Sequence, residues 1–246
     1  MKLLVCISKT PDTTSKISFT NDGTTFNQDG VQYIMNPYDE WYALVKALEI
    51  KEKEGGTVTL VHVGPAGNDT IIRKGLAIGA DDAIRINKEA SDSLDVATQI
   101  AKAIEGEQYD LIFTGKETIE FNNSEVGSML AELLDLPFIS YATSMTTEGN
   151  HASLTRDMGG SEEKVELETP FVLSASKGIA EQRIPNMRGI MMAKSKPIKV
   201  VEPETVESRI NIEKYETPSQ RTECVLIDPE NMDELVRRLH EEAKVI

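Results

Sequence analysis

Apolar and polar positions along the chain follow two periods in turn, which predicts strands that alternate with helices. Residues 2–8 form an almost continuous apolar run, as expected of a buried strand. Residues 13–35 are polar and carry Asn-Asp-Gly and Asp-Gly turn signals, which predict a hairpin outside the main sheet. Asn36 and Pro37 suit the N-cap and first position of a helix, with an apolar stripe at Trp41, Leu44, Val45 and Leu48.

The same strand–helix unit then repeats. We predict further strands over 57–63, 83–86, 111–114 and 170–175, and further helices over 69–78 and 91–104. Strands that alternate with helices give a doubly wound, mostly parallel sheet with right-handed crossovers, an α/β fold of the Rossmann-like class. Residues 143–168 lose this pattern and predict an antiparallel ribbon with a turn at Met158-Gly159-Gly160.

The end of the chain differs from the rest. Residues 1–202 are expected to form one α/β domain, and residues 203–246 a polar C-terminal arm that ends in a helix. Asp228 and Pro229 suit the start of this helix, and its apolar face would hold Met232, Leu235, Val236 and Leu239. Such an arm either packs onto another chain or folds back on its own domain.

Composition excludes several classes of protein. The net charge of −15 over 246 residues argues against nucleic-acid binding. No apolar run reaches the ~20 residues that span a bilayer, so no membrane insertion is expected. The short apolar start differs from a secretory signal, which predicts a cytoplasmic protein. Two cysteines and three scattered histidines predict no metal site.

Motifs for bond-making catalysis are absent from the sequence. There is no GxGxxG after the first strand, no GxxxxGK[ST], and no local pattern of a Ser/His/Asp or Cys/His set. We therefore expect a protein that is not itself an enzyme, and an ATP-using enzyme is disfavoured.

Residues 115–129 are the most informative local segment, because they follow a predicted strand of a parallel sheet, where ligands bind. Asn122 and Glu125 have the spacing of a capping box, which would start a helix. A helix N-terminus suits a phosphate, and Gly127 would let the ligand approach the backbone. The alternative is an ordinary strand–loop–helix connection.

Residues 182–200 contain no acidic side chain in an otherwise acidic protein. The basic residues of this segment are Arg183, Arg188, Lys194, Lys196 and Lys199. Such a segment suits encounter with an acidic partner. Alternatively, Ile190, Met191 and Met192 pack in the core and the lysines are merely solvated.

Four segments together resemble the beta subunit of the electron-transfer flavoproteins. They are Leu4-Val5-Cys6-Ile7-Ser8-Lys9 with Pro11-Asp12; Asp29-Gly30-Val31 leading to Met35-Asn36-Pro37-Tyr38-Asp39-Glu40; Gly115-Lys116 through Gly127-Ser128-Met129-Leu130-Ala131; and Ile184-Pro185-Asn186-Met187-Arg188-Gly189-Ile190-Met191-Met192-Ala193-Lys194. Their order and spacing agree with the family from the first strand to about residue 200, with a weaker tail.

The resemblance implies a heterodimer with an FAD-carrying alpha subunit. Such proteins accept electrons from dehydrogenases, for example acyl-CoA dehydrogenases, and pass them toward a quinone oxidoreductase. The beta subunit holds a structural AMP or, in electron-bifurcating members, a second FAD. By position, the adenine-nucleotide pocket would use Cys6, Asn36, Pro37, Tyr38, Asp39, Val63, Phe121, Asn122, Asn123, Ser124, Glu125, Val126, Gly127, Ser128 and Met129. Thr13 and Tyr38 would lie toward the flavin of the alpha subunit.

The sequence departs from the family's AMP-binding pattern in places. Val126 stands where many AMP-binding members have threonine, and valine is frequent in members that bind FAD. The run from Met35 to Tyr38 favours AMP, which is our expectation. The resemblance also makes 182–200 a recognition loop for dehydrogenases, with Met187 as its anchor and Arg188 and Lys194 beside it. A stand-alone nucleotide sensor, like the universal stress proteins, is the remaining alternative.

Overall fold

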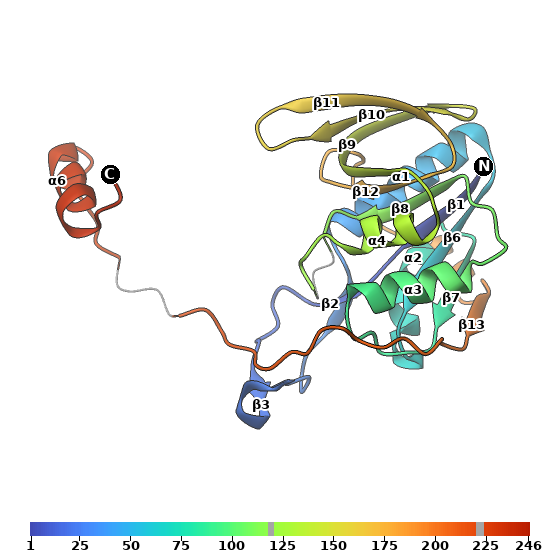
Figure 1. Ribbon diagram of the computed structural model, residues 1–246, viewed down its shortest axis with the longest axis horizontal. Coiled ribbons are helices and arrows are strands. Elements are labelled where there is room, and N and C mark those ends of the chain that lie inside the picture. Colours follow the sequence, from blue (N-terminus) through green and yellow to red (C-terminus); the bar gives the residue numbers. More distant parts are fainter. Residues whose placement is uncertain (118–120, 220–223) are drawn as a thin grey trace. The chain divides into compact units, whose positions relative to one another are not determined.

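A computed structural model describes residues 1–117, 121–219 and 224–246 (Figure 1). Contacts divide the chain into a main unit, residues 1–16 and 28–212, and a smaller unit, residues 17–27 and 213–246. In the described part of the chain, every helix is too short or too polar to cross a bilayer.

The main unit is built on a sheet with the strand order β11-β10-β9-β12-β8-β1-β6-β7-β13. Its strands are β1 (Lys2–Cys6), β6 (Thr57–Val63), β7 (Asp82–Ile86), β8 (Leu111–Gly115), β9 (Phe138–Glu148), β10 (His151–Asp157), β11 (Glu162–Glu168), β12 (Phe171–Ala175) and β13 (Ile198–Val201). In the order of the sheet, all pairs from β9 through β12, β8, β1, β6 and β7 to β13 are parallel. The strands β10 and β11 add the antiparallel ribbon. The predicted doubly wound, mostly parallel sheet is confirmed.

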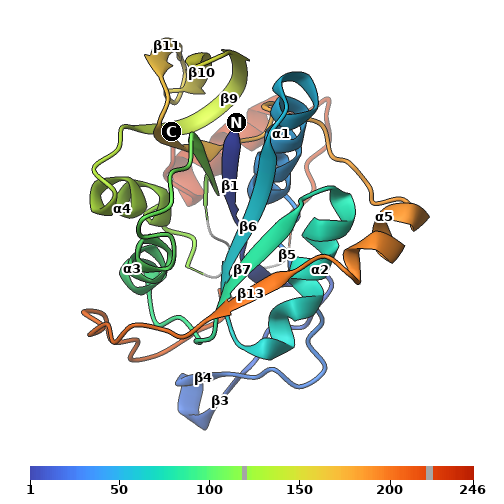
Figure 2. The ribbon, with the colours of Figure 1, turned by 90° about the vertical axis from the view of Figure 1, so that its right-hand side faces the viewer.

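Helices cover both faces of this sheet (Figure 2). They are α1 (Asp39–Glu54), α2 (Asp69–Ile78), α3 (Ser93–Ala103), α4 (Val126–Leu133) and α5 (Met187–Ala193), with a 3₁₀ turn η2 (Ala66–Asn68) before α2. The helices α1 and α2 lie on one face, and α3 and α4 lie on the other. Since β1 leads to α1 while β8 leads to α4, the chain changes direction between these neighbouring strands, and ligands bind at this point of such sheets.

Each face of the sheet has its own apolar core. Leu3, Leu44, Leu60 and Leu76 are fully or almost fully buried between the sheet and the face of α1 and α2. A second cluster, which includes Leu4 and Ile100, fills the face of α3 and α4. Strand residues therefore alternate between two buried faces, which explains why β1 is apolar after Lys2 and why β6 is buried from Val58 to His62.

Helix starts differ from the sequence predictions in three places. The helix α1 begins at Asp39, two residues after Pro37, because Asn36 Oδ1 accepts a hydrogen bond from the Tyr38 backbone N–H (3.1 Å) in a turn that precedes it. The predicted capping box at Asn122 is wrong, since α4 begins at Val126. The predicted start at Asp228 and Pro229 is also wrong, because Asn231 caps α6 (Met232–Arg237).

Two short pairs complete the described strands. Strands β2 (Lys9–Pro11) and β5 (Tyr33–Met35) are antiparallel and belong to the main unit. The hairpin of β3 (Phe19–Thr20) and β4 (Thr25–Phe26), with its turn η1 (Asn21–Gly23), belongs to the smaller unit. There the Phe19 ring stacks on the Tyr215 ring, with 5.3 Å between the ring centres, so the hairpin packs against this part of the arm. The arm ends in α6 and a π-helical turn η3 (Arg238–Glu242).

Candidate functional site

The carboxyl ends of β1, β6 and β8 bring together the segments that the sequence marks for a ligand. Cys6 ends β1 and is buried, and Val63 ends β6. Both belong to the apolar cluster on the face of α3 and α4, against which Met129 of α4 also packs. Burial, reinforced by the Glu40 carboxylate, raises the pKa of the Cys6 thiol, so this side chain acts as a neutral apolar surface.

The start of α4 lies beside this surface and carries no side-chain cap. The neighbouring helix α3 is capped by Asp92, whose carboxylate accepts the Asp95 N–H at 2.8 Å. The N–H groups of the first turn of α4 have no partner within the helix, so they suit an anion. A phosphate group fits this end of the site.

The loop before α4 is held by its own side chains. Asn123 Nδ2 donates to Ser93 Oγ at 2.7 Å and to Glu125 Oε2 at 2.8 Å, which ties the loop to the start of α3. Asn122 and Ser124 have φ angles of 50° and 59°, in the left-handed region. The backbone of the loop therefore passes through the left-handed region twice before the helix begins.

Gly127 is needed for the close packing of α4. A Cβ at this position would lie 2.7 Å from Thr114 Oγ1 and 2.9 Å from the Phe138 ring. Glycine thus lets α4 sit close to β8 and β9. This packing makes a bulky substitution at Gly127 a poor test of ligand binding, and the approach of a ligand to this glycine stays a prediction.

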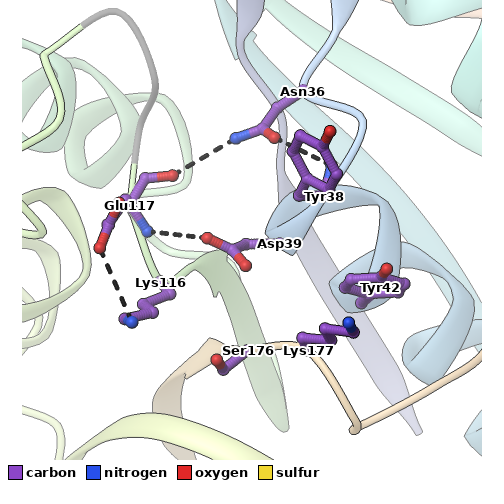
Figure 3. Close-up of a pocket in the computed structure, with 8 residues that line it drawn as sticks. All are labelled: Asn36, Tyr38, Asp39, Tyr42, Lys116, Glu117, Ser176 and Lys177. Carbon is purple, nitrogen blue, oxygen red and sulfur yellow. Dashed lines mark hydrogen bonds and ion pairs between the residues drawn. The ribbon is translucent and has the colours of Figure 1, made fainter. Parts of the chain in front are cut away.

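A cavity of about 420 Å³ opens beside this edge, between the start of α1 and the ends of β8 and β12 (Figure 3). It is lined by Asn36, Tyr38, Asp39, Tyr42, Lys116, Glu117, Ser176 and Lys177. Among the predicted site residues, Asn36, Tyr38 and Asp39 are therefore brought together here. The structure does not place Pro37 or Thr13 in this lining, and Thr13 is exposed in the turn after β2.

Hydrogen bonds between side chains and the backbone of Glu117 join the two sides of this cavity. Asn36 Nδ2 donates to the Glu117 carbonyl at 3.3 Å, and the Glu117 N–H donates to Asp39 Oδ2 at 3.3 Å. Burial raises the pKa of Asp39, although the Glu117 N–H and Lys116 favour its charged form. Lys116 also lies 5.1 Å from the centre of the Tyr141 ring, a cation–π contact. The start of α1 is thus coupled to the loop that leads toward α4.

Five lining residues were not among the predicted site residues: Tyr42, Lys116, Glu117, Ser176 and Lys177. Ser176 and Lys177 follow β12, so the rule that ligands bind beyond the carboxyl ends of parallel strands could have found them. Tyr42 gave no signal, because its position on α1 reads as part of an ordinary helix. Among the described residues, no group of His, Cys, Asp or Glu side chains could hold a metal ion.

The acid-free segment 182–200 is anchored at both ends. At its start, the Trp41 indole N–H donates to the Arg183 carbonyl at 3.1 Å, and the Arg183 guanidinium pairs with Glu52. At its end, Arg73 donates to the Ala193 carbonyl at 2.6 Å, and Lys196 Nζ donates to the Leu76 carbonyl at 2.9 Å. Arg183 and Lys196 therefore have structural roles.

Between these anchors, α5 and the residues just before it present apolar side chains to solvent. The exposed fractions are 85% for Ile184, 75% for Met187 and 69% for Met191. The alternative that Ile190, Met191 and Met192 pack in the core is wrong, because all three are exposed in this chain. Arg188 and Lys194 are exposed beside them, so the segment is an apolar knob with basic flanks.

Comparison with known proteins decides the family. A family model described as "Electron transfer flavoprotein domain" matches residues 23–206. The beta subunit of the electron transfer flavoprotein of Bacillus subtilis is 35% identical, with all of both chains covered. The human beta subunit is 32% identical over 100% of this chain and 99% of its own length. That of Thermoanaerobacterium thermosaccharolyticum is 34% identical over 84% of this chain and 80% of its own.

The chain belongs to the electron transfer flavoprotein family, as a beta subunit. The resemblance found in four sequence segments is thus confirmed over the whole length. The flavoprotein family transfers electrons, and the predicted role of this chain as part of an electron carrier follows at that level.

His62 of this flavoprotein subunit lies next to the candidate site and is buried. Burial lowers the pKa of His62 from 6.5 to about 4. The nearby Lys9 and Arg85 lower it further, while the bond to the Ile7 carbonyl and the charge of Glu89 act in the opposite direction. His62 is therefore neutral in the folded protein at ordinary pH.

This low pKa predicts a loss of stability in mild acid. The unfolded chain takes up a proton at His62 near pH 6.5 while the folded chain does not, so stability present above that pH is lost toward pH 4. At about 1.4 kcal/mol per pH unit, His62 alone should remove about 2 kcal/mol of unfolding free energy between roughly pH 6.5 and pH 5. Urea unfolding of the wild type and of His62→Asn checks this, because the other titrating groups are common to both. Parallel pH profiles of the two proteins would contradict it.

Proposed function

We propose that this chain is the nucleotide-bearing subunit of a heterodimeric electron carrier and binds AMP at the carboxyl edge of its sheet. One observation carries the nucleotide site: the uncapped start of α4 lies beside an apolar surface formed by Cys6 and Val63. The N–H groups would hold the phosphate and the apolar strand ends would hold the base. Residues 36–39 and 121–129 would complete the pocket, as the family resemblance implies.

The partner would be an FAD-carrying alpha subunit. The names of the relatives as beta subunits support such a partner, and the C-terminal arm supports it independently. Residues 203–246 would pack on that subunit, since the exposed apolar side chains of α6 include Met232 and Val236. Thr13 and Tyr38 would face its flavin, and Tyr38 is 54% exposed at the mouth of the cavity.

Electrons would come from flavin dehydrogenases, such as acyl-CoA dehydrogenases, and would pass toward a quinone oxidoreductase. The exposed knob of α5 supports this role, because flexible methionine side chains suit irregular apolar pockets. Arg188 and Lys194 would favour a partner whose pocket is rimmed by carboxylates. The chain itself would contribute binding and positioning rather than bond-making chemistry.

A second FAD in place of AMP is the alternative within the family. Val126 suggested it from the sequence, but this side chain is only 5% exposed in the packing of α4. Its identity is therefore explained by packing, and AMP remains the proposed ligand. A stand-alone nucleotide sensor would need neither the arm nor the knob of α5.

Ser128→Glu tests the nucleotide site. Ser128 is exposed in the first turn of α4, where an acidic side chain stabilises the helix, so the fold should be unharmed. A carboxylate there would repel a phosphate, and we expect the affinity for AMP to fall at least ~10-fold. Equilibrium binding of AMP to the nucleotide-depleted heterodimer measures this change.

Ser128→Gln is the matched control, because it has the same size without the charge. It should retain most of the affinity for AMP. If Ser128→Glu binds AMP as the wild type does, the phosphate does not lie at the start of α4 and the proposed site is wrong.

A further inference from the structure

A buried polar cluster lies under the ends of β1 and β6, outside every group of residues assigned above. His62, Asn68 and Arg85 have exposed fractions of 2%, 8% and 5%. Val61 and Val63 face the cluster under α3 and α4, so the His62 side chain points to the opposite face of the sheet. Buried polar groups are destabilising unless they are fully bonded, so this cluster needs an explanation.

Both ring nitrogens of His62 have partners. Nδ1 lies 2.8 Å from the Ile7 carbonyl oxygen, and Nε2 lies 2.9 Å from Asn68 Nδ2. A carbonyl can only accept, so Nδ1 carries the proton and Nε2 accepts from the Asn68 amide. His62 thus joins the end of β1 to the turn η2 after β6, with its tautomer fixed.

Gly64 is held by the same cluster. A Cβ on Gly64 would lie 2.3 Å from His62 Nε2 and 2.3 Å from Asn68 Nδ2, so the backbone rests directly on this pair. The Gly64 N–H donates to the Ile86 carbonyl at 2.9 Å, and its carbonyl accepts from Arg85 at 3.1 Å. The Gly64 backbone is therefore held by three contacts: with the His62–Asn68 pair, with the Ile86 carbonyl and with Arg85.

Arg85 is itself held in place. Its guanidinium donates to Asn87 Oδ1 at 2.8 Å, and its Nε lies at an ion-pair distance of 2.8 Å from Asp69 Oδ1. Asp69 begins α2, so the cluster links β7, the turn after β6 and the helix. The whole set fixes two pieces of backbone, Ile7 and Val63–Gly64.

These two pieces flank the apolar end of the proposed nucleotide site. Because β1 lies between β8 and β6, a phosphate at the start of α4 would leave the base near the ends of β1 and β6. The N–H groups of Ile7 and Gly64 already donate within the sheet, but their carbonyl oxygens each have one donor so far and can accept a second, for example from the amino group of a base. Such carbonyls can tell one base from another only if they are held rigidly.

We propose that His62, held by Asn68, is a positioning residue that fixes the strand ends at Ile7 and Val63–Gly64 so that they select adenine over other purine bases. This inference rests on the proposed nucleotide site. His62 touches no ligand in it and acts only through the backbone.

The test uses the heterodimer after its nucleotide is removed and compares the uptake of AMP with that of inosine monophosphate, which differs at the base. His62→Gln loses the donor to the Ile7 carbonyl, and we expect the preference for AMP to fall about 10-fold. His62→Asn keeps a donor close to the Nδ1 position and should retain most of the preference. Leu154→Ala, a core change in β10, is the control for a general loss of stability.

A merely structural role for His62 would lower the affinities for both nucleotides by the same factor, as expected of Leu154→Ala. That result, or an unchanged preference in His62→Gln, would overturn the inference while leaving the nucleotide site intact. If the wild type takes up neither nucleotide, the proposed site itself fails and the inference fails with it.

Discussion

Met187→Ala is expected to slow electron transfer from a dehydrogenase about 30-fold when the dehydrogenase is below saturation. An apolar anchor buried in a partner's pocket typically contributes about 2 kcal/mol or more, which corresponds to this factor. Met187 is 75% exposed at the start of α5, on a segment anchored at both ends. The flavin spectrum and the bound nucleotide should stay unchanged, because Met187 does not line the cavity beside α1.

Met158→Ala is the matched control for this experiment. Met158 is 51% exposed at the turn of the ribbon, so the change removes another exposed methionine from a different surface. Stopped-flow reduction of the flavin at several dehydrogenase concentrations measures the effect. A wild-type rate in Met187→Ala would show that α5 is not the anchor, and loss of flavin would show that the residue is structural.

Val236→Asp is expected to weaken the association of the two subunits about 30-fold or more. Full burial of a valine side chain contributes about 1.5–3 kcal/mol, and a carboxylate in an apolar interface adds a penalty. Val236 is 53% exposed on α6, and none of the residues of this helix is buried within the chain. The dissociation constant of the heterodimer, measured by titration of the purified subunits, checks the prediction.

Val200→Asp provides the same substitution at an equally accessible valine. Val200 is 51% exposed on the edge strand β13, which belongs to the main unit and not to α6. It should leave the association unchanged. Equal affinities of Val236→Asp and the wild type would show that the arm does not pack on the partner.

Elements with a clear period were predicted well from the sequence. The strand over 57–63 and the helix over 69–78 match β6 and α2 residue for residue. In both, local propensity, burial and end signals agree: Gly79 ends α2 just as the apolar stripe ends. Strand β13 was missed, because its lysine and its neighbours read only as part of a basic segment.

Helix starts were predicted less well, and the reason is local. A capping box needs extended backbone at its first residue, whereas Asn122 has a φ of 50°. The spacing of Asn122 and Glu125 is therefore coincidental in this loop. At the start of α1, Asn36 bonds the Tyr38 N–H and the Glu117 carbonyl, and the second partner is 81 residues away. Local sequence cannot reveal such a contact.

The candidate site could be predicted from the sequence only in part. The strand-end rule and the family resemblance predict residues 36–39 and 121–129, and their role in binding a nucleotide stays a prediction. The His62–Asn68 pair escaped notice, because a lone histidine in an apolar strand gives no sign of its partners. The stacking of Phe19 on Tyr215 also depends on segments far apart in the chain. The division into an α/β domain of residues 1–202 and an arm of residues 203–246 stays a prediction. The cytoplasmic location and the identity of the partners stay predictions as well.

The nucleotide content of the purified heterodimer tests the central claim most directly. Denaturation should release AMP and FAD in equal amounts, with AMP from this chain and FAD from its partner, as chromatography and mass spectrometry of the released nucleotides can show. Twice as much FAD with no AMP would identify the second-FAD alternative. Release of FAD alone in an amount equal to the heterodimer would contradict a nucleotide site at the carboxyl edge of this sheet.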